Sequence, residues 1–318
     1  MKTFSQLKNS TKKDIIIQGL MKSNGVYFIV AAPKVGKSLF ALQLAYSIVY
    51  GKQFLGYEIL KPSPVLYVTT EVDGSQIWER SENLNIEFDE ENFGAIDRSV
   101  CPSMNLNDME LEIKDFFEKH NGGILILDML KEIDFGISFD LNSYQDVSQK
   151  IMPIIRKYID KYNITIIIVH HANKVGKTLG STGLDACVDG IIRLYESTYD
   201  KNSVKVQIDN RDFPYTEFNI SRGEHGDFSI SPSDFVDEDN KEYKMLTKYI
   251  VSRKSFDTTI GELLEDPKLV MSPTQLGKMI HSKRASLAKD GITFTYKRTS
   301  EGRMYHFEYK EPDFAEND

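Results

Sequence analysis

Short apolar runs, separated by polar stretches, recur along the first two thirds of the chain. Most are rich in Val, Ile and Leu, and they have the length of about 4–8 residues that is typical of buried strands. Several of the intervening segments carry apolar residues at helical spacing. Strands that alternate with helices predict an α/β fold with a mostly parallel sheet. We expect these strands at 26–31, 65–70, 124–128, 164–169 and 188–195.

Further along the chain, short alternating strands follow one another directly at 204–208, 215–220 and 227–230. Such a run predicts hairpins that extend the parallel sheet with antiparallel strands. The helices are expected after the first strand, over most of 75–120, and at 151–162, preceded by a loop in which Asn142 or Ser143 can begin the next helix.

The last quarter of the chain has a different composition. Ser272 and Pro273 fit the N-cap and first position of a helix, and two alternating strands follow at 292–297 and 304–309. Helices followed by a basic two-stranded hairpin indicate a small winged-helix domain, which can bind DNA or dock on a protein. The predicted organisation is an N-terminal strap (1–25), an ATPase-type core (26–230), an acidic linker (231–243), the winged-helix-like domain (244–310) and an acidic tail (311–318).

The strand at 26–31 leads into a short loop, then Gly36-Lys37-Ser38, then an apolar helix. Strand, loop and helix in this order are the context in which a phosphate-binding loop has meaning, since backbone N–H groups at the helix start wrap a polyphosphate. An ordinary turn between strand and helix is the alternative. The predicted ligands are ATP and Mg²⁺, with Lys37 on the phosphates, Ser38 on the metal, and contacts from Ala32, Pro33, Lys34, Val35, Gly36, Lys37, Ser38 and Leu39.

Two predicted strands end in carboxylates, Glu71 and Asp128, and a third ends in His170-His171. The carboxyl ends of parallel strands open into the ligand crevice of such a sheet. Asp128 is therefore a candidate for the Mg²⁺ shell, and Glu71 for orienting or deprotonating water. One histidine could sense the γ-phosphate. The alternatives are a solvated loop acid at Glu71 and a polar strand end at the histidines.

Three basic features could act outside a single nucleotide site. Lys174 and Lys177 lie in a Gly- and Ser/Thr-rich loop that could contact DNA phosphates or be a plain surface loop. The Gly-Lys-Thr at 176–178 lacks the flanking strand and helix of a phosphate-binding loop. Arg211 lies on a predicted turn, where it could reach a phosphate across a subunit boundary or form a surface ion pair.

Composition narrows the class of protein. With 41% hydrophobic and 27% charged residues, the chain is typical of a soluble globular protein. Its apolar runs fall short of the ~20 residues that span a bilayer. The basic N-terminus lacks the apolar segment of a signal peptide. Cys101 and Cys187 form no zinc pattern with histidines and fit a reducing cytoplasm.

Charge is distributed unevenly along the chain. The net charge is −8, yet residues 244–310 alone carry +6, which leaves −14 on the rest. A basic segment attached to an acidic body indicates a polyanionic partner such as DNA. The expected phosphate contacts are Lys283 and Arg284 on a recognition helix, and Lys297, Arg298 and Arg303 on the wing.

Residues 15–230 resemble the RecA-fold ATPases of the RepA and DnaB hexameric helicase group, most closely the short RepA-like members of plasmids and phages. The resemblance rests on AAPKVGKSLFALQLA, the strand ending in Glu71, ILILD, VHHANK with GSTGLD, and NRDFP. It implies that Glu71 is the catalytic base, Asp128 the Walker B acid and His171 the γ-phosphate sensor. It implies that Arg211 is an arginine finger, inserted into the neighbouring subunit's site.

The chain departs from the family pattern at two positions. Ala31 replaces the first glycine of the phosphate-binding loop, and Asp209 stands where DnaB-like members often carry a lysine. Arg193 is the reserve candidate for the finger.

The sequence thus predicts a cytoplasmic, ring-forming DNA helicase, expected to be a hexamer, for the replication of a mobile element. Its predicted partner is single-stranded DNA, with duplex DNA and other replication proteins as further candidates. One alternative is an ATP-switched initiator or helicase-recruiting protein without strand displacement. Another is a RecA-like strand-pairing ATPase.

Overall fold

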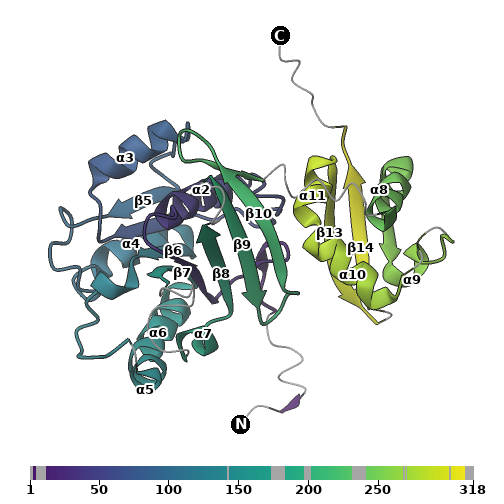
Figure 1. Ribbon diagram of the computed structural model, residues 1–318. Helices are drawn as coiled ribbons and strands as arrows, with labels where there is room; N and C mark the ends of the chain where they lie inside the picture. The colour runs from purple at the N-terminus through teal and green to yellow at the C-terminus, as the bar shows by residue number, and fades with distance from the viewer. Residues whose placement is uncertain are drawn as a thin grey trace.

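The computed structural model describes residues 3–4, 12–141, 143–172, 183–196, 202–230, 241–267, 269, 271–300 and 302–311. In Figure 1 the chain forms a large domain on the left and a small C-terminal domain on the right. In the described part of the chain, no helix is long and apolar enough to cross a membrane. The nucleotide-binding motifs lie in the large domain.

A mixed sheet forms the centre of the large domain. Its strands run parallel from β5 through β8, and the three strands beyond β8 pair antiparallel. The predicted α/β fold with an antiparallel extension is therefore confirmed. The order in the described chain is β11 (Phe228–Ile230), β10 (Thr216–Arg222), β9 (Ser203–Asn210), β8 (Gly190–Glu196), β3 (Val26–Ala31), β7 (Ile164–His171), β6 (Gly123–Asp128), β4 (Val65–Thr69) and β5 (Phe93–Ile96).

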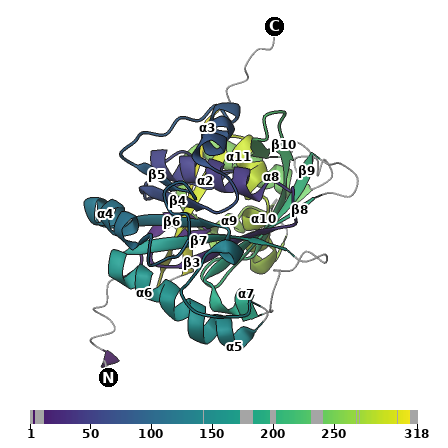
Figure 2. The same cartoon turned by 90° about the vertical axis from the view of Figure 1, so that its left-hand side faces the viewer.

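Helices cover both faces of this sheet. In Figure 2, α2 and α3 lie above it and α4, α5 and α6 lie below it. Successive residues of β3 enter opposite cores: Ile29 packs on the α2 side and Phe28 on the α4 and α6 side. The bounds are α2 (Lys37–Tyr50), α3 (Gly74–Asn83), α4 (Glu110–His120), η1 (Leu130–Glu132), α5 (Tyr144–Asp146), η2 (Val147–Ile151), α6 (Met152–Tyr162) and α7 (Gly183–Cys187).

Local boundaries agree with the sequence in part. Ser143 begins α5, and its Oγ accepts a hydrogen bond from the Asp146 N–H at 3.2 Å, as expected for an N-cap. The prediction that 75–120 is mostly helical is wrong at β5. Its four residues include Gly94 and Ala95, and so short a strand gives no clear alternation. The N-terminal segment also forms a small hairpin, β1 (Ile15–Ile17) with β2 (Met21–Lys22).

The C-terminal domain has its own apolar core and a three-stranded antiparallel sheet. The hairpin of β13 and β14 is confirmed, and so is the start of α10, where Ser272 caps the helix and Pro273 follows. The structure adds β12 and begins α8 inside the predicted linker. The elements are α8 (Lys241–Arg253), β12 (Ser255–Thr259), α9 (Ile260–Leu263), α10 (Pro273–Ser282), α11 (Arg284–Lys289), β13 (Ile292–Thr299) and β14 (Gly302–Tyr309).

Arg284 joins the two domains, so its prediction as a DNA contact is wrong. Its side chain is 4% exposed. Nε donates to the Gly56 carbonyl at 3.1 Å, and Nη2 donates to the Phe294 carbonyl at 2.7 Å. The guanidinium also lies over the rings of Tyr57 and Phe294, 5.0 and 4.2 Å from their centroids. The start of α11 faces the large domain, and this is why the charge is unavailable to a polyanion.

Two further contacts lie near Arg284. Gln18 donates from its side-chain amide to the Tyr296 carbonyl at 3.2 Å. The end of α10 lies beside β10, where a cavity of 290 Å³ is lined by Phe218 of β10 and by Lys283 of the C-terminal domain. Lys283 therefore faces the large domain in this arrangement.

Replacing Arg284 should loosen the domain junction. Arg284→Leu removes both hydrogen bonds and the charge over the rings, at a cost of about 2–4 kcal/mol. We expect a fall of several degrees in the melting temperature by calorimetry. Arg284→Lys keeps the charge without the planar fork and should lie between the two. A melting temperature of Arg284→Leu equal to that of the unmodified chain would contradict this role.

Candidate nucleotide site

The phosphate-binding loop follows β3 and ends at Gly36, where α2 begins. Gly36 has φ 98° and caps the helix without a side-chain hydrogen bond, so the first N–H groups of α2 remain available to an anion. A Cβ at this glycine would meet a nitrogen of Arg222 at 2.5 Å and the ring of Phe228 at 2.9 Å. Both the backbone angle and the close neighbours therefore require glycine.

Lys37 lies in the first turn of α2 and is 6% exposed. Burial lowers the pKa of its ammonium group, while the nearby charges of Glu71 and Asp128 act in the opposite direction. The predicted lysine and the two predicted carboxylates therefore come together at one edge of the sheet. A buried ammonium group beside exposed loop N–H groups suits a polyphosphate.

Asp128 ends β6 and is 2% exposed. Its Oδ2 accepts a hydrogen bond from the Tyr67 hydroxyl at 2.6 Å. Burial raises the pKa of Tyr67 well above its usual value, so this hydroxyl keeps its proton. In the described chain Oδ1 is buried and has no hydrogen-bond partner. A carboxylate oxygen left in this state suits a water of a hydrated Mg²⁺, so Asp128 and Ser38 fit the metal that the sequence predicts.

Backbone contacts fix the end of β4 against the end of β6. Thr70 donates from its N–H to the Asp128 carbonyl at 2.8 Å, and its Oγ1 accepts from the Met129 N–H at 3.1 Å. Glu71 follows directly, and 46% of its side chain is exposed. These bonds place an accessible carboxylate beside the buried one. A catalytic base that must meet water needs this access.

His171 ends β7 and faces Glu71, with 3.9 Å between Nε2 and Oε1. Burial lowers the pKa of this imidazole, and the charge of Lys37 lowers it further. Because the pKa falls below 6.5, the ring is neutral at pH 7, and its contact with Glu71 is no ion pair there. A neutral imidazole can donate one N–H to an anion. Its Nδ1 is buried and has no partner among the residues described.

Arg222 at the end of β10 is a residue of the site that sequence reasoning missed. Its guanidinium donates to the carbonyl oxygens of Lys34 and Val35 in the phosphate-binding loop and lies 5.5 Å from the Phe228 ring centroid. No local motif could have indicated it, because the contact joins segments far apart in the chain. The antiparallel extension thus forms one wall of the loop.

Arg211 lies at the opposite edge of the sheet from the phosphate-binding loop. Gly190, which begins β8, pairs with Tyr27 on one side and with Asn210 on the other. Arg211 therefore lies near the start of β3, and the loop lies past its end. The length of β3 separates the two by about 20 Å. Arg211 cannot serve the nucleotide site of its own subunit.

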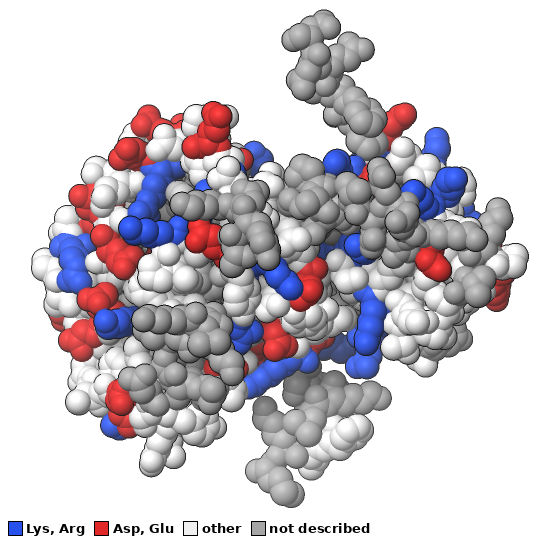
Figure 3. Space-filling model, viewed as in Figure 1, with Lys and Arg blue, Asp and Glu red and all other residues white. Residues whose placement is uncertain are grey.

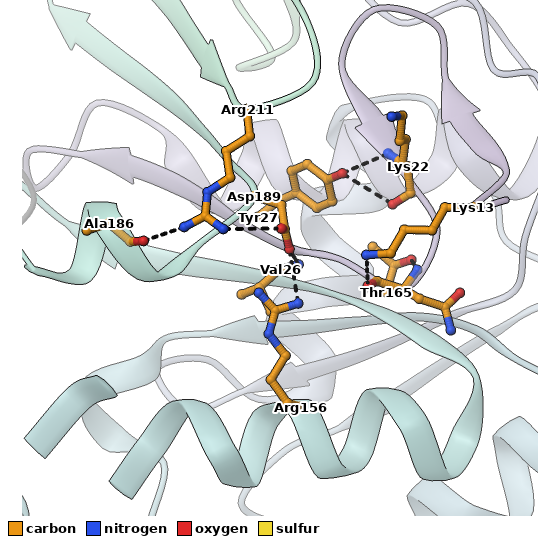
Figure 4. A network of polar contacts seen from close by, with 10 residues as sticks. Lys13, Lys22, Val26, Tyr27, Arg156, Thr165, Ala186, Asp189 and Arg211 are labelled. Carbon is orange, nitrogen blue, oxygen red and sulfur yellow. Dashed lines mark hydrogen bonds and ion pairs between the residues drawn. The ribbon is translucent and has the colours of Figure 1, made fainter. Parts of the chain in front are cut away.

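A polar network holds Arg211 at this edge (Figure 4). Asp189 accepts from the Arg211 N–H through its carbonyl at 3.0 Å, and its Oδ1 lies 3.9 Å from Nη1. Oδ2 of Asp189 accepts from the Val26 N–H at 2.8 Å and pairs with Arg156 at 3.1 Å. Arg211 also donates to the Ala186 carbonyl. Slightly more than half of its side chain is nevertheless exposed, so it remains accessible to a neighbour.

The reserve finger candidate lies elsewhere. Arg193 pairs in register with Val30, near the end of β3. It forms an ion pair with Asp185 at 2.8 Å, and 15% of its side chain is exposed. The geometry therefore favours Arg211 over Arg193 for a contact with another subunit.

The predicted DNA contacts are placed unevenly. Lys174 and Lys177 lie outside the described residues. Lys297 and Arg298 are exposed on the β13–β14 hairpin, and Arg298 pairs directly with Arg303 across it. Like charges in this position repel each other, and the described chain gives neither arginine an ion pair. The hairpin therefore presents positive charge to a partner.

Comparison with known proteins agrees with this site. The family model described as an AAA domain matches residues 4–177. DNA repair protein RadA of Aquifex aeolicus (strain VF5) is 28% identical over 195 residues, which are 61% of this chain and 38% of RadA. The chain thus spans well under half of that relative.

Solved structures were compared with the fold. The ATPase domain of a helicase has a TM-score of 0.51 at 17% identity, over 66% of this chain and 86% of that one. A KaiC-like protein, PH0186 from Pyrococcus horikoshii OT3, has a TM-score of 0.48 at 15% identity, over 68% of this chain and 94% of that one. The family match and the likeness to the helicase ATPase domain confirm a RecA-type P-loop ATPase core.

Removing the Tyr67 hydroxyl should weaken the metal site selectively. Tyr67→Phe keeps the ring but leaves Asp128 without the donor that orients it. We expect the Mg²⁺ concentration for half-maximal ATP hydrolysis to rise about tenfold, as for other groups that orient a metal ligand. The control is Tyr158→Phe, which removes another buried hydroxyl that donates to a carbonyl, Leu106, on the other face. Equal Mg²⁺ dependence in the two variants would disprove the role of Tyr67.

Proposed function

The chain belongs to the AAA domain family, and we propose that it is a ring-forming, Mg²⁺-dependent ATPase that acts on DNA as a replicative helicase of a mobile element. ATP binds at the phosphate-binding loop of one subunit and is completed by a neighbour. A hexamer is the ring size that the resemblance suggests. Single-stranded DNA is the proposed substrate.

The separation of Arg211 from its own nucleotide site carries this proposal. An arginine that is exposed, held by a carboxylate and about 20 Å from its own phosphate-binding loop has no role within one subunit's reaction. Head-to-tail assembly would bring the Arg211 edge of one subunit against the loop edge of the next, and repeated contacts of this kind close into a ring. Asp189 supports the same assignment, because it fixes the direction of the arginine.

The residues of the site divide the chemistry among them. Lys37 and the N–H groups of the loop hold the phosphates. Ser38 and Asp128 hold Mg²⁺, which when bound neutralises charge on the transferring phosphoryl group. Glu71 orients a water and accepts its proton. Neutral His171 donates to the γ-phosphate, and Arg211 of the neighbour supports the charge that develops during transfer.

The C-terminal domain is proposed to be a winged helix that binds DNA phosphates through Lys297, Arg298 and Arg303. Its sheet order, β12-β14-β13, and the helices before the hairpin support this assignment. Positive side chains are frequent over this domain in Figure 3. Lys174 and Lys177 remain proposed contacts to single-stranded DNA. We keep the proposed division of the chain at 1–25, 26–230, 231–243, 244–310 and 311–318.

Mixing two inactive variants tests the shared site. Lys37→Ala removes phosphate binding, and Arg211→Ala should lower hydrolysis about 10³-fold while ATP still binds. In a mixed ring, the loop of an Arg211→Ala subunit can meet the arginine of a Lys37→Ala subunit. An equal mixture should therefore regain up to about a quarter of the unmodified rate. The control is Lys22→Ala, which removes a cation at the same edge (Figure 4).

Two outcomes would contradict the shared site. Normal hydrolysis by Arg211→Ala would remove the arginine from the mechanism. Two inactive variants that gain nothing on mixing would show that the arginine acts only through its own subunit, against the geometry of the sheet.

Single-stranded DNA should stimulate ATP hydrolysis if the chain is a translocating motor. We expect at least a tenfold increase at low salt, declining steeply as salt is added because phosphate contacts release counterions. Lys37→Ala provides the blank. The stimulated rate justifies a strand-displacement assay.

Hydrolysis that ignores single strands would favour the alternative, an ATP-switched initiator or helicase-recruiting protein. The exposed cations of the hairpin would then act on duplex DNA. Duplex binding that is lost in a Lys297→Ala/Arg298→Ala variant, without strand displacement by the unmodified chain, would establish that alternative.

A further inference from the structure

An open groove lies on the large domain away from the nucleotide site. Its volume is 790 Å³, and it is bounded by α3, by Tyr46 near the end of α2, and by the segment 85–93 before β5. The chain's one tryptophan, Trp78, lines it. The groove is independent of every residue assigned to ATP or DNA above.

Packing of the domain does not explain the position of Trp78. The inward face of α3 carries Ile77, Ser81 and Leu84, which are all buried. Trp78 lies one residue off this face and is 62% exposed. An aromatic side chain can bury about 150–250 Å² in a contact, so its exposure leaves a large apolar surface in water.

The floor beside Trp78 is aromatic and rigid. Phe88 stacks on Phe93 with 3.8 Å between ring centroids, and Tyr46 meets Phe88 edge-on at 5.7 Å. These rings hold one another in place, so a ligand would find a preformed surface. Exposed tryptophan over such a surface is the usual composition of a protein-binding hot spot.

The rim of the groove is acidic. Four carboxylates line it, and none of the lining residues is Lys or Arg. In the described chain Glu82, Glu87 and Glu90 have no ion pair, whereas Asp89 accepts from the N–H of Asn92 at 2.7 Å. Acidic side chains gather over α3 at the upper left of Figure 3. This charge disfavours nucleic acid and anionic lipid and favours a cationic ligand.

We propose that this groove binds a basic segment of a partner protein, which places at least one bulky apolar side chain beside Trp78 and its Lys or Arg residues against the glutamates of the rim. The volume suits a few side chains of a peptide. The partner would reach α3 from outside, a few residues past Glu71, without entering the nucleotide site.

Peptide selection on the folded chain tests the proposal. Random dodecapeptides displayed on phage are selected on the unmodified protein, with soluble Trp78→Ala protein as competitor. We expect the recovered peptides to combine Lys or Arg with Leu, Phe or Trp. Synthetic copies should shift the fluorescence of Trp78 to shorter wavelength, since it is the one tryptophan in the chain, and should bind more weakly as salt rises.

Two variants and their controls locate the contact. Trp78→Ala should weaken binding at least tenfold, whereas Leu111→Ala, which removes another 62% exposed apolar side chain on α4, should not. Glu82→Lys should weaken binding, whereas Glu112→Lys on α4 should not. ATP hydrolysis by all four variants within twofold of the unmodified rate shows that each is folded.

Several results would overturn the proposal. These are recovery of no peptides, recovery of acidic or neutral peptides, or peptides that bind Trp78→Ala as well as the unmodified chain. A shift of Trp78 fluorescence on raising the protein concentration alone, abolished by Glu82→Lys, would assign the groove to a second copy of this chain and exclude the partner proposed here.

Discussion

Parallel pairing of the central strands is the constraint on which the nucleotide site depends. Ala31 pairs with His171, and Asp128 pairs with Thr69 on one side and Val169 on the other. The backbone hydrogen bonds of these pairs bring the strand ends to one level, so that a lysine, two carboxylates and an imidazole meet. A slip of one residue would turn each side chain to the opposite face of the sheet.

The antiparallel extension has two structural roles. Arg222 at the end of β10 contacts the phosphate-binding loop, and the same strand lies beside α10 of the C-terminal domain. β10 is therefore a common neighbour of the nucleotide site and the domain junction. The junction itself depends on a buried guanidinium that replaces water with two carbonyl oxygens and two aromatic rings.

The sequence could predict the parts of the site that depend on contiguous segments. Lys37 follows from strand, loop and helix, and Asp128 and His171 follow from apolar runs that end at a common edge. It could not predict Arg222, Asp189 beside Arg211, or the burial of Arg284, because each contact requires the pairing of distant segments. It missed β5 because four residues around a glycine carry no usable periodicity.

The two outermost strands of the large sheet, β5 and β11, span only four and three residues. Long open strands offer unpaired N–H and C=O groups to other chains and promote aggregation. Here these groups are few at either margin, and α11 contacts β11. Copies of this chain are thus poorly suited to join by extending one sheet into the next, and productive association must instead rely on side chains. The protein can reach the high local concentrations of an assembly without the hazard of cross-β growth.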